Sequence, residues 1–257
     1  MFRRECISVR CLAIATMVTA ATIAVAQDRR PGGAGPAFTV KQFKATNGQT
    51  LRYSLFVPAD KQAEEKLPVV LCLHGRGGNT TAADILARAD SQAKHRAIVM
   101  APGISNSERW VATPNRETPR SVMPELIEAL DSVLREHSGD VDRVYVTGQS
   151  MGGYGTWGLL ASHPTKFAAA APVCGAWADE DAPKMKNVPI WAFHGAEDPT
   201  VPVAGSQRMI EAIKKAGGEP RYTEYAGVGH NSWLRAYATA ELWDWMFAQK
   251  RSAQAKP

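Results

Sequence analysis

The feature that most constrains this fold is a series of short, almost uninterrupted apolar segments. The clearest covers residues 67–73, Leu-Pro-Val-Val-Leu-Cys-Leu, and others cover residues 97–100, 144–147, 167–173 and 189–193. A strand that is apolar on both faces is typical of a parallel sheet covered on both sides. Segments with helical spacing alternate with these runs, so the sequence predicts one doubly wound α/β domain with a mostly parallel central sheet and helices on both faces.

Three of the intervening segments are predicted to be helices from the spacing of their apolar residues. The first covers residues 121–137, with Ser121 as the predicted N-cap. Its apolar face consists of Met123, Leu126, Ile127, Leu130, Val133 and Leu134. The second contains Met209, Ile210 and Ile213 and ends at Gly217-Gly218, and the third is dominated by Leu242, Trp245, Met246 and Phe247.

The segment before the first buried run has a different pattern. Residues 38–43 and 51–57 alternate between apolar and polar side chains, and Asn47-Gly48 between them is a turn signal. We therefore expect an antiparallel N-terminal hairpin at an edge of the sheet.

The first residues of the chain have the pattern of a secretory signal peptide. Three arginines precede an apolar run of about sixteen residues, which is short for a membrane span of ~20, and Ala24-Val25-Ala26 forms an A-x-A cleavage site. The expected division is therefore a signal peptide over residues 1–26, a flexible leader over residues 27–36 and one domain over residues 37–257. This predicts a secreted or periplasmic protein that has no stable association with the membrane after cleavage.

Charge and cysteine content exclude some functions and leave one question open. Cleavage after Ala26 would remove three arginines and one glutamate, so the formal net charge would fall from +5 to +3. These charges are scattered, which gives no indication of a nucleic-acid partner. Cys72 and Cys174 lie in or just after apolar runs, where they are expected as small buried hydrophobic residues, with a disulfide between them as the alternative.

The strongest chemical signal is Gly148-Gln149-Ser150-Met151-Gly152, between an apolar run and a segment with helical spacing. Small residues on both sides of Ser150 allow a sharp backbone reversal that exposes its hydroxyl, and the N–H of Met151 would then face a developing oxyanion. The alternative is an ordinary glycine-rich turn.

The loops after three other predicted strands carry polar residues at the same edge of the sheet. His74-Gly75-Arg76-Gly77-Gly78 follows the first strand, and the N–H of Arg76 is a candidate second oxyanion donor. Asp198 follows the run at 189–193, with Glu197 as the adjacent competitor and the acidic residues 179–181 as a more distant one. His230 lies in a glycine-rich loop after the strand-like residues 221–225. The six histidines show no metal-ligand spacing.

Tryptophans supply candidate substrate-binding residues. The loop over residues 102–120 is long for a connection between a strand and a helix, and it carries Trp110. Trp177 and Trp233 also follow predicted strand ends. These three rings are expected either to form the walls of a substrate pocket or to pack in the core.

Taken together, these motifs and their order resemble the α/β-hydrolase superfamily. The closer likeness is to secreted carboxylesterases related to dienelactone hydrolases, to polyhydroxyalkanoate-depolymerase-like esterases and to the catalytic domain of prolyl oligopeptidases. The resemblance implies Ser150 as nucleophile, Asp198 as acid and His230 as base, since His230 is the one histidine beyond Asp198 and the superfamily order is Ser, acid, His. Dienelactone hydrolases proper use cysteine in place of serine. Prolyl oligopeptidases carry a large propeller domain, whereas about forty residues separate the predicted cleavage site from the first buried strand here. Both differences make a general esterase the expected closer relative.

The resemblance implies a secreted serine esterase that acts on a small-molecule or polymer ester and uses no metal or organic cofactor. A serine peptidase of prolyl oligopeptidase type acting on short peptides is one alternative. A non-catalytic binding protein that has kept the α/β-hydrolase fold is another.

Overall fold

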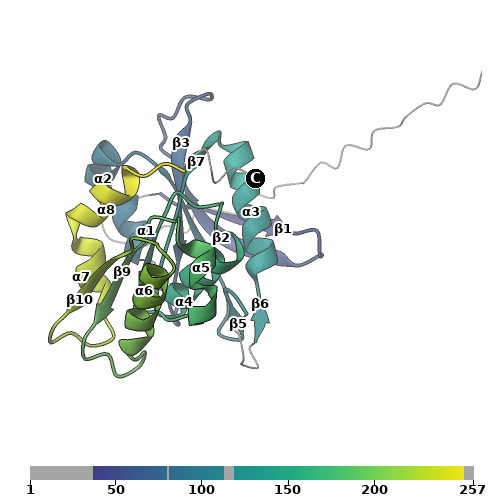
Figure 1. The fold of residues 1–257 in the computed structure, drawn as a ribbon. Coiled ribbons are helices and arrows are strands. Elements are labelled where there is room, and N and C mark those ends of the chain that lie inside the picture. Colours follow the sequence, from purple (N-terminus) through teal and green to yellow (C-terminus); the bar gives the residue numbers. More distant parts are fainter. Residues whose placement is uncertain (1–36, 80, 113–118, 252–257) are drawn as a thin grey trace, which may run out of the picture.

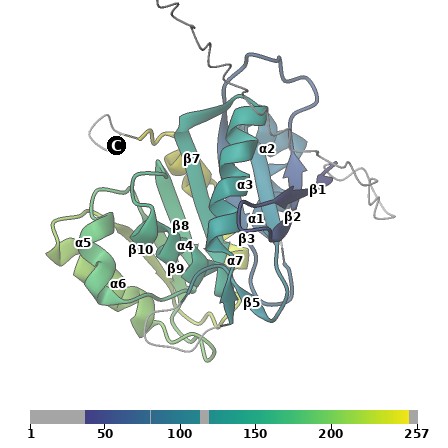
Figure 2. The same cartoon turned by 90° about the vertical axis from the view of Figure 1, so that its right-hand side faces the viewer.

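A computed structural model describes residues 37–79, 81–112 and 119–251 of the chain. The predicted signal peptide and leader therefore lie outside the described residues. Figures 1 and 2 show a central sheet with helices on both of its faces. Within the described ranges, no helix is long and apolar enough to cross a membrane.

The central sheet has eight strands in the order β1-β2-β4-β3-β7-β8-β9-β10. Strand β2 is antiparallel to both of its neighbours, and every pairing from β4 to β10 is parallel. The predicted N-terminal hairpin at the sheet edge is therefore confirmed. The strands are β1 (Thr39–Lys44), β2 (Thr50–Phe56), β3 (Leu67–Leu73), β4 (Ile98–Gly103), β7 (Gly139–Gln149), β8 (Ala169–Val173), β9 (Trp191–Gly195) and β10 (Arg221–Tyr225).

The helices form two layers, one on each face of the sheet (Figure 1). One layer contains α3 (Met123–Glu136), α4 (Met151–Ser162), α5 (Ala182–Met185) and α6 (Ala204–Lys215), with the short 3-10 helix η1 (Asp179–Asp181) before α5. The other contains α1 (Thr81–Leu86), α2 (Ala89–Lys94), α7 (Trp233–Ala238) and α8 (Ala240–Phe247).

The sheet separates two hydrophobic cores, which explains why its central strands are apolar throughout. All seven residues of β3 are buried. Val69 and Leu71 pack in the core beneath α3 and α4, whereas Val70 and Cys72 pack in the core beneath α1, α7 and α8. Successive side chains of a strand point to opposite faces, so each core takes every second residue. Cys72 and Cys174 are free thiols, and both are buried.

Several predicted boundaries are wrong in detail, and two of them are informative. Helix α3 begins at Met123 with Val122 at its N-cap position, and Ser121 lies instead in the two-residue strand β6 (Arg120–Ser121), which pairs with β5 (Glu108–Arg109). Pro124 in the first turn fits this start, because proline is tolerated there without its N–H. The strand predicted from the apolar run at residues 144–147 is the second case: β7 extends from Gly139 to Gln149, and its first residues are mostly polar.

Candidate active site

Ser150 occupies a strained turn between β7 and α4. Its backbone has φ +53° and ψ −116°, a conformation that non-glycine residues rarely adopt. The chain can reverse here because glycines flank the turn. A side chain at Gly148 would overlap the carbonyl oxygen of Gly152, and one at Gly152 would overlap that of Leu73. The Ser150 N–H donates to Val173 O at 3.0 Å, which attaches the turn to the neighbouring strand.

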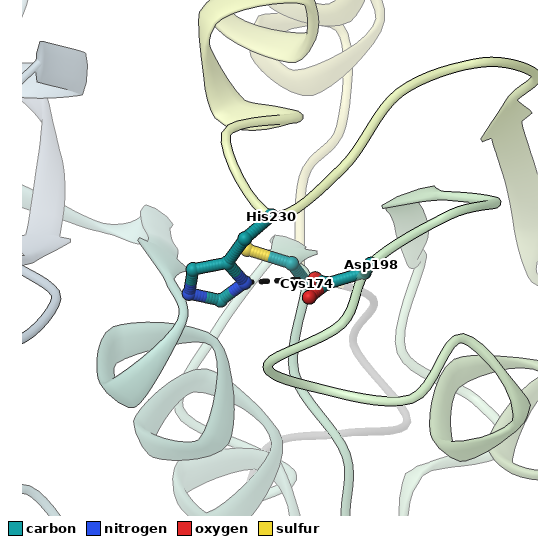
Figure 3. Close-up of side chains that lie close together, drawn as sticks. All are labelled: Cys174, Asp198 and His230. Atoms are coloured by element: carbon teal, nitrogen blue, oxygen red, sulfur yellow. Dashed lines mark hydrogen bonds and ion pairs between the residues drawn. The ribbon is translucent and has the colours of Figure 1, made fainter.

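His230 and Asp198 complete a continuous chain of hydrogen bonds from Ser150. Ser150 Oγ lies 2.9 Å from His230 Nε2, and His230 Nδ1 lies 2.8 Å from Asp198 Oδ2. Figure 3 shows the second of these contacts as a dashed line. A carboxylate only accepts, so Nδ1 carries the proton and Nε2 is left to accept from the serine hydroxyl. The structure thus brings together three residues that are far apart in the sequence.

The environment of Asp198 keeps its carboxylate ionised. Burial raises the pKa of this group, but hydrogen bonds from His230 and from the N–H groups of Val201 and Thr200 outweigh burial, and the net pKa is lowered. These backbone donors lie 2.9 Å and 2.8 Å from Oδ1. The competitor Glu197 is exposed and is not hydrogen-bonded to His230.

The glycine-rich turn after β3 lies directly against the serine turn. A Cβ at Gly75 would lie 3.2 Å from Gln149 O, so the two backbones nearly touch. His74 fixes this turn: its Nδ1 lies 2.7 Å from Gly75 O, and its Nε2 accepts the N–H of Ile104 at 3.1 Å. Burial lowers the pKa of His74, which agrees with a neutral ring that donates at one nitrogen and accepts at the other.

The two predicted oxyanion donors, Arg76 and Met151, both line the cavity above Ser150. Met151 is the first residue of α4, where a backbone N–H has no partner within the helix. Among the described residues, neither backbone N–H is hydrogen-bonded to an acceptor. With no acceptor in the described part of the chain, both N–H groups can donate a hydrogen bond to a ligand in the cavity.

The cavity above Ser150 has a volume of about 590 Å³, a size suited to a small organic ligand. It is lined by Gly75, Arg76, Asn79, Arg109, Trp110, Val111, Gln149, Ser150, Met151, Tyr154, Thr200, His230 and Trp233.

The three predicted tryptophans have different positions relative to this cavity. Trp233 lies edge-to-face against His230, with ring centroids 5.4 Å apart. Trp110 is 1% exposed, and its Nε1 donates to His74 O at 2.9 Å, so it belongs to the core and to the cavity wall at once. Trp177 is not among the described residues that line the cavity; its Nε1 donates to Asp181 Oδ2 at 2.8 Å.

Cys174 lies behind the Asp198–His230 pair, as Figure 3 shows. Its sulfur and one ligand atom of each partner lie within 4.8 Å of one another, and zinc binds these three ligand types. Two features disfavour a metal here. Asp198 and His230 are already hydrogen-bonded to each other, and burial raises the pKa of Cys174 to about 12, which opposes thiolate formation. The cluster fits a buried thiol packed beside the pair better than a metal site.

Sequence patterns did not identify several residues that line the cavity. Tyr154 is one helical turn beyond Ser150, and this spacing alone could have indicated it. Asn79 lies in the turn after β3 and Arg109 in the short strand β5, and the sequence has no comparable signal that identifies these two side chains.

An α/β-hydrolase fold carrying a Ser-His-Asp chain at the carboxyl edge of its sheet defines the class of this protein. The comparison with known families is consistent with that class: the profile of the dienelactone hydrolase family matches residues 55–241. The chain belongs to the dienelactone hydrolase family.

Two curated relatives illustrate the range of similar sequences. An uncharacterized secreted protein of Arthroderma benhamiae is 26% identical over 75% of this chain and 24% of its own length. A probable feruloyl esterase C of Aspergillus niger is 25% identical over 71% of this chain and 68% of its own length. The chain thus spans about a quarter of the first relative and about two thirds of the second.

Two solved structures show the same fold. The crystal structure of a thermostable esterase superposes with a TM-score of 0.78 at 35% identity, and the match covers 83% of this chain and 63% of that one. Dipeptidyl peptidase 4 of Porphyromonas gingivalis gives a TM-score of 0.64 at 14% identity, over 84% of this chain and 36% of that one. At that identity, the second likeness shows the fold alone.

Proposed function

We propose that this protein is a secreted serine esterase that hydrolyses carboxylic esters through an acyl-enzyme intermediate. The observation that carries the proposal is the unbroken chain from Ser150 Oγ through His230 to Asp198, which opens into a cavity of about 590 Å³. Nucleophile, base and orienting acid are each within hydrogen-bonding distance of the next, as nucleophilic catalysis requires.

In the proposed reaction, Ser150 Oγ attacks the ester carbonyl carbon while His230 Nε2 takes the hydroxyl proton. The resulting oxyanion accepts hydrogen bonds from the N–H groups of Arg76 and Met151. His230 then protonates the departing alcohol, and the acyl group stays on Ser150. A water molecule, activated by the same imidazole, releases the carboxylic acid. Asp198 holds the imidazole tautomer throughout.

Hydrolysis of p-nitrophenyl acetate tests this function. The wild-type protein should release p-nitrophenol, and the Ser150→Ala variant should do so at a rate near that of buffer. A panel of p-nitrophenyl esters of rising chain length, with a feruloyl ester and acetylated xylan beside it, would define the substrate class. The names of similar proteins suggest that range, since they include a feruloyl esterase, a poly(3-hydroxyalkanoate) depolymerase and an acetylxylan esterase.

A peptidase acting on short peptides is the second candidate, because the motifs around Ser150, Asp198 and His230 also resemble those of prolyl oligopeptidase catalytic domains. Cleavage of aminoacyl-p-nitroanilides without hydrolysis of acetate esters would favour it. A non-catalytic binding protein is the third candidate, and covalent labelling by a fluorophosphonate probe would eliminate it.

Secretion is part of the proposal and rests on residues 1–26 and on the secreted relative in Arthroderma benhamiae. Expression with the natural N-terminus should give an exported protein whose first residue is Gln27. An intracellular product that keeps Met1 would contradict it. We also propose that the mature protein binds neither nucleic acid nor membrane stably.

A further inference from the structure

A second histidine contacts the acid of the proposed triad, and the mechanism above makes no use of it. His194 lies at the end of β9 and is fully buried. Its Nε2 is 3.3 Å from Asp198 Oδ2 and 2.9 Å from Val201 O. Its Nδ1 is 2.7 Å from the hydroxyl of Ser206, a buried residue of α6. Asp198 Oδ2 therefore lies between two imidazole rings.

The contacts of His194 determine where its proton lies. Burial lowers the pKa of His194, so the ring is neutral and carries one N–H. Both groups that face Nε2, the carboxylate and a carbonyl, only accept hydrogen bonds, so the proton must be on Nε2. Nδ1 is then an acceptor for the hydroxyl proton of Ser206. The same hydroxyl also donates to Gly175 O at 2.9 Å, so its single proton is shared between Nδ1 and the carbonyl, and both contacts hold Ser206 beside the ring.

This arrangement surrounds the carboxylate with donors on both oxygens. Oδ1 accepts from two backbone N–H groups, and Oδ2 accepts from His230. The Nε2–H of His194 donates to Val201 O at 2.9 Å and lies beside Oδ2, with Nε2 3.3 Å from that oxygen, so its positive end also faces the carboxylate. We propose that His194, held in one tautomer by Ser206, is a positioning residue that fixes the Asp198 carboxylate toward His230 and moderates its charge. The inference rests on the proposed function, because it assigns a role within the same site.

The direction of the expected pH effect follows from the charges around Asp198. In the described part of the chain, the titratable groups that face its carboxylate are His230, His194 and Cys174. The thiol stays neutral, since burial raises its pKa to about 12. Loss of the His194 donor would leave more negative charge for His230 and so favour its protonated form. The acid limb of the kcat/KM profile should then move to higher pH.

A matched pair of variants tests the donor itself. His194→Gln keeps a donor at the same place, because the glutamine NH₂ and the histidine Nε2 are the same number of bonds from Cα. His194→Met gives a side chain of similar length that has no donor. A hydrogen bond to a charged group corresponds to roughly a 10- to 100-fold change in rate. His194→Met should lower kcat by about that factor with little change in KM and shift the acid limb upward. His194→Gln should keep most of the activity and the wild-type profile. Equal losses in both folded variants, or no loss in either, would overturn the proposal.

The Ser206→Ala variant provides a milder test if His194→Met does not fold. It removes the donor to Nδ1 and should lower kcat by less, with an acid-limb shift of the same sign. An unchanged kcat and pH profile in a folded Ser206→Ala protein would contradict the role of Ser206 and His194. Failure of the proposed function is seen separately, because wild-type protein would then not hydrolyse p-nitrophenyl acetate at all.

Discussion

Two walls of the same cavity are built in different ways. The wall that carries Ser150 and the Gly75 turn is held by backbone against backbone, with glycines where any side chain would collide. Another wall, which carries Arg109 and Trp110, belongs to the connection between β4 and α3, where the short β5–β6 pair is joined to the rest of the site by side-chain contacts such as that of the Trp110 indole with His74 O. The turn that carries the proposed nucleophile thus depends on close backbone contacts that few substitutions at its glycines would preserve. We expect the wall that carries Arg109 and Trp110 to tolerate more substitutions.

The largest expected effect comes from removing the reacting groups. Ser150→Ala and His230→Ala should each lower kcat by about 10⁶-fold, and the double variant should be little worse because the two residues act as one unit. Steady-state hydrolysis of p-nitrophenyl acetate by folded variants measures this. Additive losses in the double variant would contradict a shared step.

The next largest effect distinguishes the two adjacent acids. Asp198→Asn should lower kcat by about 10⁴-fold, because an amide cannot hold the required imidazole tautomer. Glu197→Gln is the matched control: it is the neighbouring residue, it is exposed, and it should be nearly silent. If Glu197→Gln is the damaging change, the assignment of the acid is wrong by one position.

The backbone-held wall should be sensitive to a single methyl group. Gly152→Ala places a Cβ onto Leu73 O and should lower the free energy of unfolding by about 1–3 kcal/mol or more, with loss of activity. Gly103→Ala is the control, because its nearest neighbour, Arg52 O, is 3.9 Å from the added Cβ. Urea unfolding of both variants compares them. A Gly152→Ala protein of wild-type stability would show that the wall is not held as described.

The lowered pKa of Asp198 predicts how stability depends on pH. Because its pKa is below the ordinary value of 3.8 in the folded protein, the ionised carboxylate stabilises the fold above that pH. This contribution is lost as the pH falls through the folded value. The difference in unfolding free energy between wild type and Asp198→Asn should therefore shrink as the pH falls from about 5 to about 2. A difference that stays constant over this range would contradict the lowered pKa.

The smallest effect concerns a side chain that the backbone-held wall presents to the cavity. The guanidinium of Arg76 is exposed at the cavity, where it could pair with a carboxylate on the substrate or face solvent. Arg76→Met keeps the backbone donor. If the guanidinium binds a carboxylate of the substrate, kcat/KM of Arg76→Met should be roughly 10-fold below that of wild type for a succinyl monoester. For an acetate ester it should hardly change. Equal effects on both substrates would leave Arg76 with a backbone role only.

The contrast between the walls also explains what the sequence could predict. The sheet, the hairpin and the meeting of Ser150, Asp198 and His230 at one edge follow from local patterns, since parallel strands place their carboxyl ends together. The cavity walls and the contact between His194 and Asp198 depend on long-range packing. Trp177 illustrates this: like Trp233 it follows a strand end, yet its ring turns to Asp181, while that of Trp233 meets His230.

The most direct test of the account is the site of covalent labelling by a fluorophosphonate. Intact mass and peptide mapping should show one adduct, on Ser150, in wild-type protein and in the Glu197→Gln control. Labelling should be strongly slowed in His230→Ala, because the base that activates the hydroxyl is gone. An adduct on another residue, or equally fast labelling without His230, would contradict the proposal that Ser150 is a nucleophile activated by His230.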